Sequence, residues 1–340
     1  MRRTVAIGDP QAPLATFFAV LDRHGLRKND RVAPDVQLVV MGDYFDWGTP
    51  EQAEKAGADA LELLEWLVSH DEDEVVLIVG NHDLGRVGEL SSFDDESFGR
   101  ARRDALVIYG ALADAAHAAF TRRWPELPTA ELAARDFSSF NTKQRDLVTA
   151  LLRAGRFHLA WAPADDLLML HAGVTAPQLA RLGIDPNSGA RAIAAMLDRK
   201  LADAVKAWPG PPARLAIPGI HRPGHSTTGE GDGMLYHRAA LEPKARRFDP
   251  RDLPRGLAQA IGHVRDKKSR ELLGDEWTDG EPPQDGILRH LVTDGAMVRY
   301  ARGLPERVDP SKATMLFLDA GMNHVAPEKY DVFRLDDLRR

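Results

Sequence analysis

Residues 35–48 read DVQLVVMGDYFDWG, and this stretch decides the fold class. Its first seven residues include a short apolar run, which is typical of a strand buried in a parallel sheet. Gly42 and Asp43 follow at once, so the run ends in a turn that carries a carboxylate. In open α/β sheets, ligands bind beyond the carboxyl ends of the strands. The stretch therefore predicts an α/β protein with a site residue at a strand end.

Four further fragments carry polar residues: GDPQ (8–11), GNHD (80–83), LHAG (170–173) and IGH (261–263). Most of them repeat this arrangement, because they directly follow or end a short run rich in Val, Ile, Leu or Met. Taken singly, each fragment has a plain explanation as a turn or a helix cap. Together they place Asp, Asn, Gln and His side chains at the ends of successive predicted strands. That ordered set indicates a two-metal hydrolase site.

The composition excludes several classes of protein. The chain has 340 residues, a net charge of −7 and no cysteine. The acidic balance argues against a long nucleic-acid partner, which normally meets a basic surface. The lack of cysteine excludes disulfides and thiol catalysis. No apolar run approaches the ~20 residues of a membrane span, and the N-terminus resembles a strand more than a signal peptide. We therefore expect a cytoplasmic protein that does not enter a membrane.

The predicted elements alternate between strands and helices. A segment at about residues 94–150 is rich in Ala and Arg, has helical spacing and separates two strands that carry motifs, so we expect a helical insertion or cap there. We expect the chain, residues 1–340, to form a single domain around it. We expect strands at 157–162 and 166–170 to pair, with Pro163 in the turn between them. The remaining predictions are strands at 4–7, 35–41, 75–79, 295–299 and 315–318, helices at 14–24, 53–69 and 188–208, and an irregular loop at 209–225.

The polar residues have the chemistry of metal ligands. Asp9 and Gln11 are two positions apart, so on an extended backbone their side chains point the same way and reach one ion. A carboxylate at Asp43 is placed to bridge two ions. Mixed oxygen and nitrogen ligands suit Mn²⁺, Fe or Zn²⁺ better than Ca²⁺ or Mg²⁺. The other candidate ligands are Asn81, His171 and His263.

Two residues have the chemistry of a proton donor and its orienting group. His82 lies beside Asn81 and is free to donate a proton to a leaving group. Asp46 is the carboxylate expected to orient its imidazole.

In these motifs the chain resembles the calcineurin-like metallophosphoesterases. It looks closest to the phosphoprotein phosphatase branch, which includes the bacterial diadenosine-tetraphosphate hydrolases and the Shewanella-like phosphatases. That branch has GDxHG, GDxxDRG, GNHE, HAG or HGG, and a final GHT, and each has a recognisable form here. The resemblance implies a four-layer α/β fold, with two facing β-sheets flanked by helices.

The resemblance also implies roles for individual residues. It assigns Asp9, Gln11 and Asp43 to one divalent ion, and Asp43, Asn81, His171 and His263 to a second. GDGMLYHR at 231–238 stands where the family has a segment that supplies a phosphate-gripping arginine, which implies that role for Arg238. Asn81 is expected to contact the substrate phosphate as well.

The chain departs from the family pattern at three positions. Gln11 stands where most members have His, and a neutral amide is a weaker donor than an imidazole. Trp47 replaces the arginine of GDxxDRG, which removes one expected phosphate clamp. Arg265 takes the place of the second His in the broader GHxH motif. The phosphatase branch also lacks that His, so this last departure agrees with the placement.

The expected function is metal-dependent phosphomonoester hydrolysis of a phosphoprotein or a small phosphorylated metabolite, by direct attack of a metal-bridging hydroxide. One alternative is a pyrophosphohydrolase of dinucleoside polyphosphates or nucleotides. The other alternative is a degenerate, non-catalytic module that binds phosphate. The departures at Gln11 and Trp47 favour this alternative, whereas the pair of His82 and Asp46 argues against it. The sequence leaves the substrate, the native metals, the oligomeric state and the roles of His221, His225 and His237 open.

Overall fold

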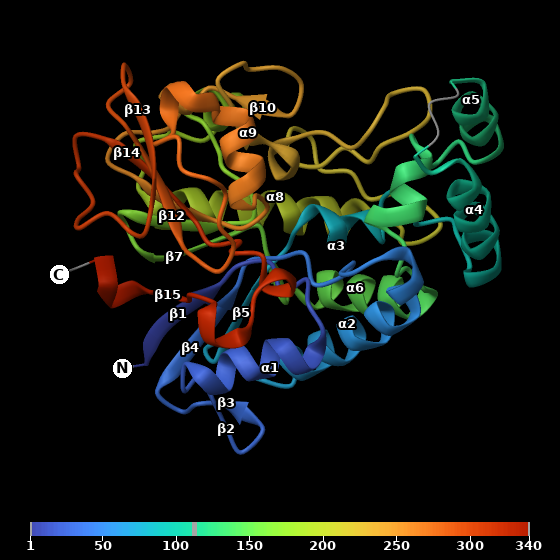
Figure 1. Ribbon diagram of the computed structural model, residues 1–340, viewed down its shortest axis with the longest axis horizontal. Helices are drawn as coiled ribbons and strands as arrows, with labels where there is room; N and C mark the ends of the chain where they lie inside the picture. The colour runs from blue at the N-terminus through green and yellow to red at the C-terminus, as the bar shows by residue number, and fades with distance from the viewer. Residues whose placement is uncertain (1, 111–113, 339–340) are drawn as a thin grey trace.

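The computed structural model describes residues 2–110 and 114–338, and its centre is a pair of β-sheets (Figure 1). The first sheet consists of β1 (Arg3–Ile7), β4 (Val36–Val40), β5 (Val75–Ile78), β6 (Phe157–His158) and β15 (Phe333–Arg334). Its strand order is β15-β1-β4-β5-β6. All neighbours are parallel except β15, which pairs antiparallel with β1 at one edge.

The second sheet consists of β7 (Ala160–Ala164), β8 (Leu167–Leu170), β11 (Ala258–Ile261), β12 (Arg289–Thr293), β13 (Val298–Arg302) and β14 (Ala313–Phe317). Its order is β13-β12-β14-β11-β8-β7, with β8, β11 and β14 parallel to one another. Two small ribbons add β2 (Arg27–Lys28) with β3 (Arg31–Val32), and β9 (Arg238–Ala239) with β10 (Arg247–Phe248).

Alternate residues of the strands build two apolar cores. In β4 the side chains of Leu38 and Val40 join the core beneath the helices, whereas Val39 joins the core between the sheets. In β8, Leu168 faces the helices and Met169 faces the opposite sheet. A strand with both faces buried gives a continuous apolar run, which is why residues 36–40 are uniformly apolar apart from one Gln.

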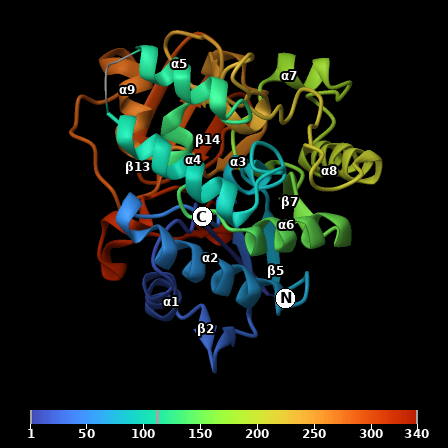
Figure 2. The same cartoon turned by 90° about the vertical axis from the view of Figure 1, so that its right-hand side faces the viewer.

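The helices are α1 (Leu14–Arg23), α2 (Ala53–Val68), α3 (Asn81–Gly85), α4 (Asp95–Ile108), α5 (Asp114–Arg123), α6 (Thr142–Ala154), α7 (Ala176–Arg181), α8 (Ala190–Ala207) and α9 (Asp266–Trp277). The helices α1 and α2 lie on the outer side of the first sheet (Figure 2), and α8 packs against β7 and β8. The layers therefore follow the order helix, sheet, sheet, helix. This arrangement confirms the predicted fold class. No described helix is long and apolar enough to cross a membrane.

Most predicted elements are present, with two corrections. The strands at 4–7, 35–41 and 75–79 and the helices at 14–24 and 53–69 match β1, β4, β5, α1 and α2. Residues 157–162 do not form one strand, because Phe157 pairs in the first sheet and Ala160 in the second. Pro163 lies within β7 and not in a turn, which is tolerated because β7 is an edge strand. The helix α9 and the strand β12 were not predicted.

Candidate metal centre and active site

The carboxyl ends of parallel strands from both sheets meet around one cavity. Asp9 follows β1, Asp43 follows β4, Asn81 follows β5, His171 follows β8 and His263 follows β11. Asp9, Asp43, Asn81 and His263 line a cavity with a volume of about 1030 Å³, together with Gln11. His171 is fully buried behind them. The structure thus brings all the predicted ligands to one place.

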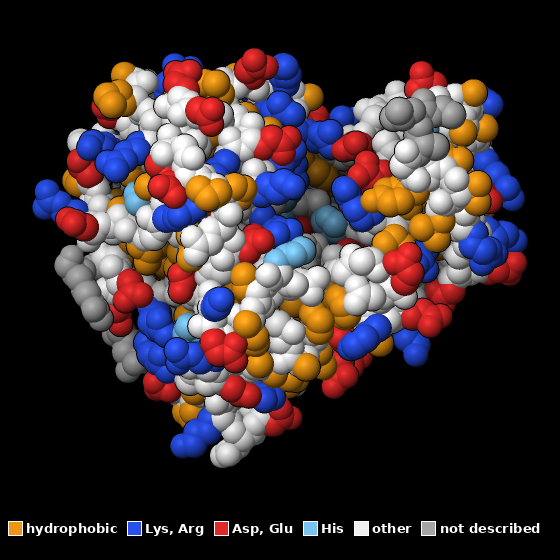
Figure 3. All heavy atoms as spheres, in the orientation of Figure 1, with side chains coloured by type: hydrophobic (Ala, Val, Ile, Leu, Met, Phe, Trp, Pro, Cys, Tyr) orange, Lys and Arg blue, Asp and Glu red, His pale blue; other side chains and the backbone are white. Residues whose placement is uncertain are grey.

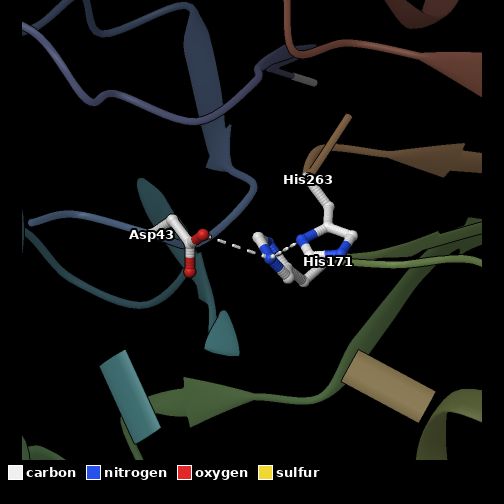
Figure 4. Close-up of side chains that lie close together, drawn as sticks. All are labelled: Asp43, His171 and His263. Carbon is white, nitrogen blue, oxygen red and sulfur yellow. Dashed lines mark hydrogen bonds and ion pairs between the residues drawn. The ribbon is translucent and has the colours of Figure 1, made fainter. Parts of the chain in front are cut away.

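Three of these residues form a compact cluster (Figure 4). Nε2 of His171 lies 3.5 Å from Oδ2 of Asp43 and 3.1 Å from Nδ1 of His263. Oδ1 of Asn81 lies 3.0 Å from the same Nε2 atom. One ligand atom from each of Asp43, His171 and His263 lies within 4.8 Å of the others. The side chains come from separate strands and point toward one another.

The hydrogen bonding of His171 shows that the ring nitrogen facing the cluster carries a lone pair and no proton. Nδ1 of His171 lies 2.8 Å from the carbonyl oxygen of Met41, which accepts its proton. Because a neutral imidazole carries one N–H, Nε2 is then unprotonated. Its lone pair faces a carboxylate oxygen of Asp43 and an amide oxygen of Asn81. Electron-rich atoms converge in this way around a cation, so the residues present fit a divalent metal.

The electrostatics of the cluster also favour a cation. Burial raises the pKa of Asp9 well above its ordinary value, and the nearby carboxylates of Asp319 and Asp43 raise it further. Burial, Arg238 and His171 hold the pKa of His263 well below its ordinary value, so its imidazole is neutral at neutral pH. Burial lowers the pKa of His171 as well, so neither histidine of the cluster balances the buried carboxylates, and divalent ions would supply that charge.

Close packing of the loops makes glycine necessary at two positions. A Cβ atom on Gly80 would lie 2.1 Å from Oδ1 of Asp43, and one on Gly262 would lie 2.0 Å from Oδ1 of Asp9. Asp43 and His263 themselves have φ angles of +56° and +65°. Such left-handed conformations at non-glycine residues cost on the order of 1–3 kcal/mol and are concentrated at functional sites.

Asp83 ties two of the motif loops together. Its carboxylate is fully buried and accepts hydrogen bonds from the backbone N–H groups of Gly80, Asp43 and Tyr44, at 2.7, 2.9 and 3.0 Å. Burial and the charge of Asp43 raise its pKa to about 7 despite these bonds. The sequence places Asp83 in the GNHD motif but does not reveal this structural role.

His82 and Asp46 form the expected pair. Nδ1 of His82 lies 2.9 Å from Oδ2 of Asp46, and its Nε2 lies 4.0 Å from Oδ2 of Asp43. Burial lowers the pKa of His82, but Asp43 and the hydrogen bond to Asp46 outweigh it and raise the pKa to about 9. The pKa of Asp46 falls to about 2, because Arg86 and His82 outweigh its burial. His82 therefore carries a proton at neutral pH.

A network that the sequence did not predict holds Asp46. Nη1 of Arg86, a fully buried side chain, donates to Oδ2 of Asp46 at 2.6 Å. The hydroxyl of Ser139 donates to Oδ1 of Asp46 at 2.6 Å. Oε1 of Gln144 accepts from Nε of Arg86 at 3.2 Å, and the ring of Phe137 packs edge-on against His82. Arg86 is only four residues beyond His82, whereas Ser139 lies 93 residues beyond Asp46.

Other predicted residues have defined positions. Gln11 lines the cavity, and its Nε2 donates to the carbonyl oxygen of Phe45 at 2.9 Å, which leaves the amide oxygen as its ligand atom. Trp47 and Arg238 line the cavity as well. His221 is buried, stacks on Tyr236 and is not among the lining residues. His324 also lies at the cavity and contacts Arg265.

Comparison with known families matches residues 2–204 to the calcineurin-like phosphoesterase model. The chain belongs to the calcineurin-like phosphoesterase family. The family implies divalent metal ions at the cluster of Asp and His described above. This confirms the superfamily that the motifs indicated.

Other comparisons add little to this assignment. No curated protein matches the phosphoesterase. Among solved structures it is similar to a mutant cold-active protein tyrosine phosphatase, with 15% sequence identity and a TM-score of 0.33. That similarity covers 61% of this chain and 49% of the other, so the phosphoesterase spans about half the length of that protein.

Proposed function

We propose that this phosphoesterase hydrolyses phosphomonoesters of a phosphoprotein or a small phosphorylated metabolite, with two divalent metal ions. The observation that carries the proposal is the position of the proton donor beside the ligand cluster. Nε2 of His82 lies 4.0 Å from Asp43, in the cavity that the ligands line. Ester hydrolysis needs both a nucleophile at phosphorus and a proton for the leaving alkoxide, and both requirements meet in this cavity.

The proposed ligands divide between two ions that share Asp43. We assign Asp9 and Gln11 with Asp43 to one ion, and Asn81, His171 and His263 with Asp43 to the other. When bound, such a pair of ions acidifies a water molecule and holds the oxygens of the phosphoryl centre. We propose Mn²⁺ as the native metal, with Fe and Zn²⁺ as the other ions that this mixed ligand set suits.

The chain's own side chains have three proposed tasks. His82 donates its Nε2 proton to the leaving oxygen, and Asp46 keeps the ring in the required orientation through its Nδ1 atom. Arg238 and Asn81 hold the phosphate oxygens. Trp47 lies at the cavity where the phosphatase branch has a second arginine, so Arg238 is the main clamp.

The proposal extends to the subfamily and the domain organisation. Placement near the phosphoprotein phosphatase branch is supported by Arg265 in the position of the second His, where that branch also lacks His. We further propose that residues 1–340 act as one domain, in which residues 94–150 are an insertion. The three helices that fall wholly or largely in that segment, and the contact of its Ser139 with Asp46, support this view.

Hydrolysis assays with defined substrates test the proposal. With Mn²⁺ added, we expect the protein to cleave 4-nitrophenyl phosphate, to lose activity in a chelator and to regain it with the metal. We expect Asp43→Asn and His171→Ala to lose both activity and bound metal. Faster cleavage of diadenosine tetraphosphate than of any monoester would instead identify a pyrophosphohydrolase. Full metal binding with no turnover of either class would identify a binding module.

A further inference from the structure

A small parallel ribbon places two arginines side by side on the cavity wall. In the pairing of β9 with β10, Arg238 and Arg247 are register partners, and the backbone N–H of Arg238 donates to the carbonyl of Arg246 at 3.0 Å. Residues in register on neighbouring strands are about 4.8 Å apart and point to the same face. Both arginines line the cavity that contains the metal cluster.

These two arginines differ from the other cations nearby because, in the described part of the chain, no carboxylate lies within ion-pair distance of either. Lys244 pairs with Glu242 at 2.9 Å, and Arg246 pairs with Glu230. Among residues 2–110 and 114–338, neither Arg238 nor Arg247 has an ion-pair partner. Arg238 makes one long bond, from Nη1 to the carbonyl of Tyr236 at 3.4 Å, and its buried Nε has no acceptor.

The two arginines lie at different depths in the cavity. Arg238 is half-buried, and burial lowers the pKa of its guanidinium while the nearby Asp43 carboxylate opposes that shift, whereas Arg247 is exposed. Figure 3 shows the hollow on this face, with Lys and Arg side chains along its rim and His side chains at its bottom. The inner arginine therefore faces the metal cluster, and its partner lies toward the rim.

We propose that Arg247 forms a second anion subsite beside Arg238, and that the substrate is a small phosphorylated molecule with a second anionic group near the phosphate that is cleaved. This inference rests on the proposed function. Arg238 holds the reacting phosphate, and Arg247 binds the second group, either a phosphate or a carboxylate. A cavity of about 1030 Å³ has the size of a site for a small molecule.

Kinetics on matched substrates test the subsite in the Mn²⁺-loaded enzyme. The pairs are glycerol 3-phosphate with 3-phosphoglycerate, and fructose 6-phosphate with fructose 1,6-bisphosphate. We expect KM to be about tenfold lower for the member with the second anion, which is the usual scale of one charged hydrogen bond. The first pair reports a carboxylate and the second a phosphate.

The variant Arg247→Gln isolates the subsite. We expect it to raise the KM of the two-anion substrates about tenfold more than that of glycerol 3-phosphate. Arg299→Gln is the matched control, because Arg299 is exposed on β13 and does not line the cavity. An equal rise in KM for all substrates would show that Arg247 holds the reacting phosphate, and would overturn the proposal. A preference for an acidic phosphopeptide over every metabolite would overturn it as well.

Binding separates this inference from the proposed function. Calorimetry compares inorganic phosphate with pyrophosphate on the wild type and on Arg247→Gln. Tighter binding of pyrophosphate that is lost in Arg247→Gln supports the subsite even if no ester is hydrolysed, which would refute only the proposed function. Equal affinities for the two anions in the wild type would refute the subsite.

Discussion

At the scale of single residues, the protonation of His82 sets an expected pH dependence. Its pKa in the folded protein is raised from 6.5 to about 9, so the proton donor is charged below this value and is lost as the pH rises through it. We therefore expect the turnover of alkyl phosphates to fall at basic pH, as His82 loses its proton. Bound divalent ions repel the proton, so the fall should lie between pH 6.5 and about 9. The pH profile of kcat measures it.

The leaving group shows whether His82 donates that proton. We expect His82→Gln to slow alkyl phosphates by about 100-fold or more, the usual scale of general acid catalysis. The loss on 4-nitrophenyl phosphate should be far smaller, because its leaving oxygen needs no proton. Metal content is the control and should not change. An equal loss across the series of leaving groups would remove His82 from this role.

Gln11 predicts an imbalance between the two ions. Its amide oxygen is a weaker ligand than imidazole, and its nitrogen is held by the carbonyl of Phe45 at 2.9 Å. We expect the ion at Asp9 and Gln11 to dissociate first, so that dialysed protein holds less than two metals and gains activity with added Mn²⁺. Gln11→His should retain the second metal through dialysis. If Gln11→Ala leaves metal content and activity unchanged, Gln11 is not a ligand.

At the scale of elements, the segment at residues 94–150 reaches into the active site through Ser139. Because its hydroxyl holds Asp46 at 2.6 Å, we expect Ser139→Ala to loosen the orientation of His82. A charged hydrogen bond of this kind corresponds to a loss of about tenfold or more in kcat on alkyl phosphates. KM and metal content should remain unchanged, and Ser139→Thr should restore much of the rate.

A matched control separates this effect from a general loss of stability. Ser188 is exposed, and its hydroxyl also donates a hydrogen bond, to the carbonyl of Asp185 at 2.8 Å. Ser188→Ala should leave the rates on all substrates unchanged. A loss in Ser139→Ala that is equal for aryl and alkyl phosphates would contradict an action through His82.

The elements also show how far local sequence determines the fold. Buried strands were predictable because their apolar runs and the turns behind them are local features, as in residues 75–80. The sheet to which a strand belongs depends on distant partners, and this is why β6 and β7 were taken as one strand. The helix α9 was missed because its charged sequence carries little apolar periodicity, although Leu272 and Leu273 are buried.

At the scale of the whole molecule, the meeting of two sheets determines which polar residues share the site. The motif loops were predictable, because each follows its own strand. Asp319 also follows a predicted strand, but its place beside Asp9 was not predictable, since it depends on the parallel pairing of β14 with β11. The same holds for Arg247, which reaches the cavity through the ribbon with Arg238. Localisation in the cytoplasm remains a prediction.

The buried carboxylates at the site, which include Asp9, Asp83 and Asp319, allow a prediction of how metal removal changes the stability of the protein. A buried carboxyl with a raised pKa binds more protons in the folded state than in the unfolded state, so stability falls as the pH rises across that window. For Asp83 the window runs from 3.8 to about 7, and the pKa of Asp9 and that of Asp319 are raised as well. The metal-free protein should therefore become less stable between about pH 4 and about pH 7.

Divalent ions should remove this loss, because they neutralise the carboxylates without a proton. Ligand at 100 times its Kd stabilises a protein by about 2.7 kcal/mol, so we expect Mn²⁺ to raise the melting temperature by several degrees near neutral pH. The difference between metal-loaded and chelator-treated protein should shrink on acidification, where protons replace the ions and compete for the ligands. Asp319→Asn removes one of the charges and should weaken the pH dependence of the metal-free form. Equal melting temperatures with and without Mn²⁺ at neutral pH would mean that Asp9 and Asp43 do not hold a metal ion.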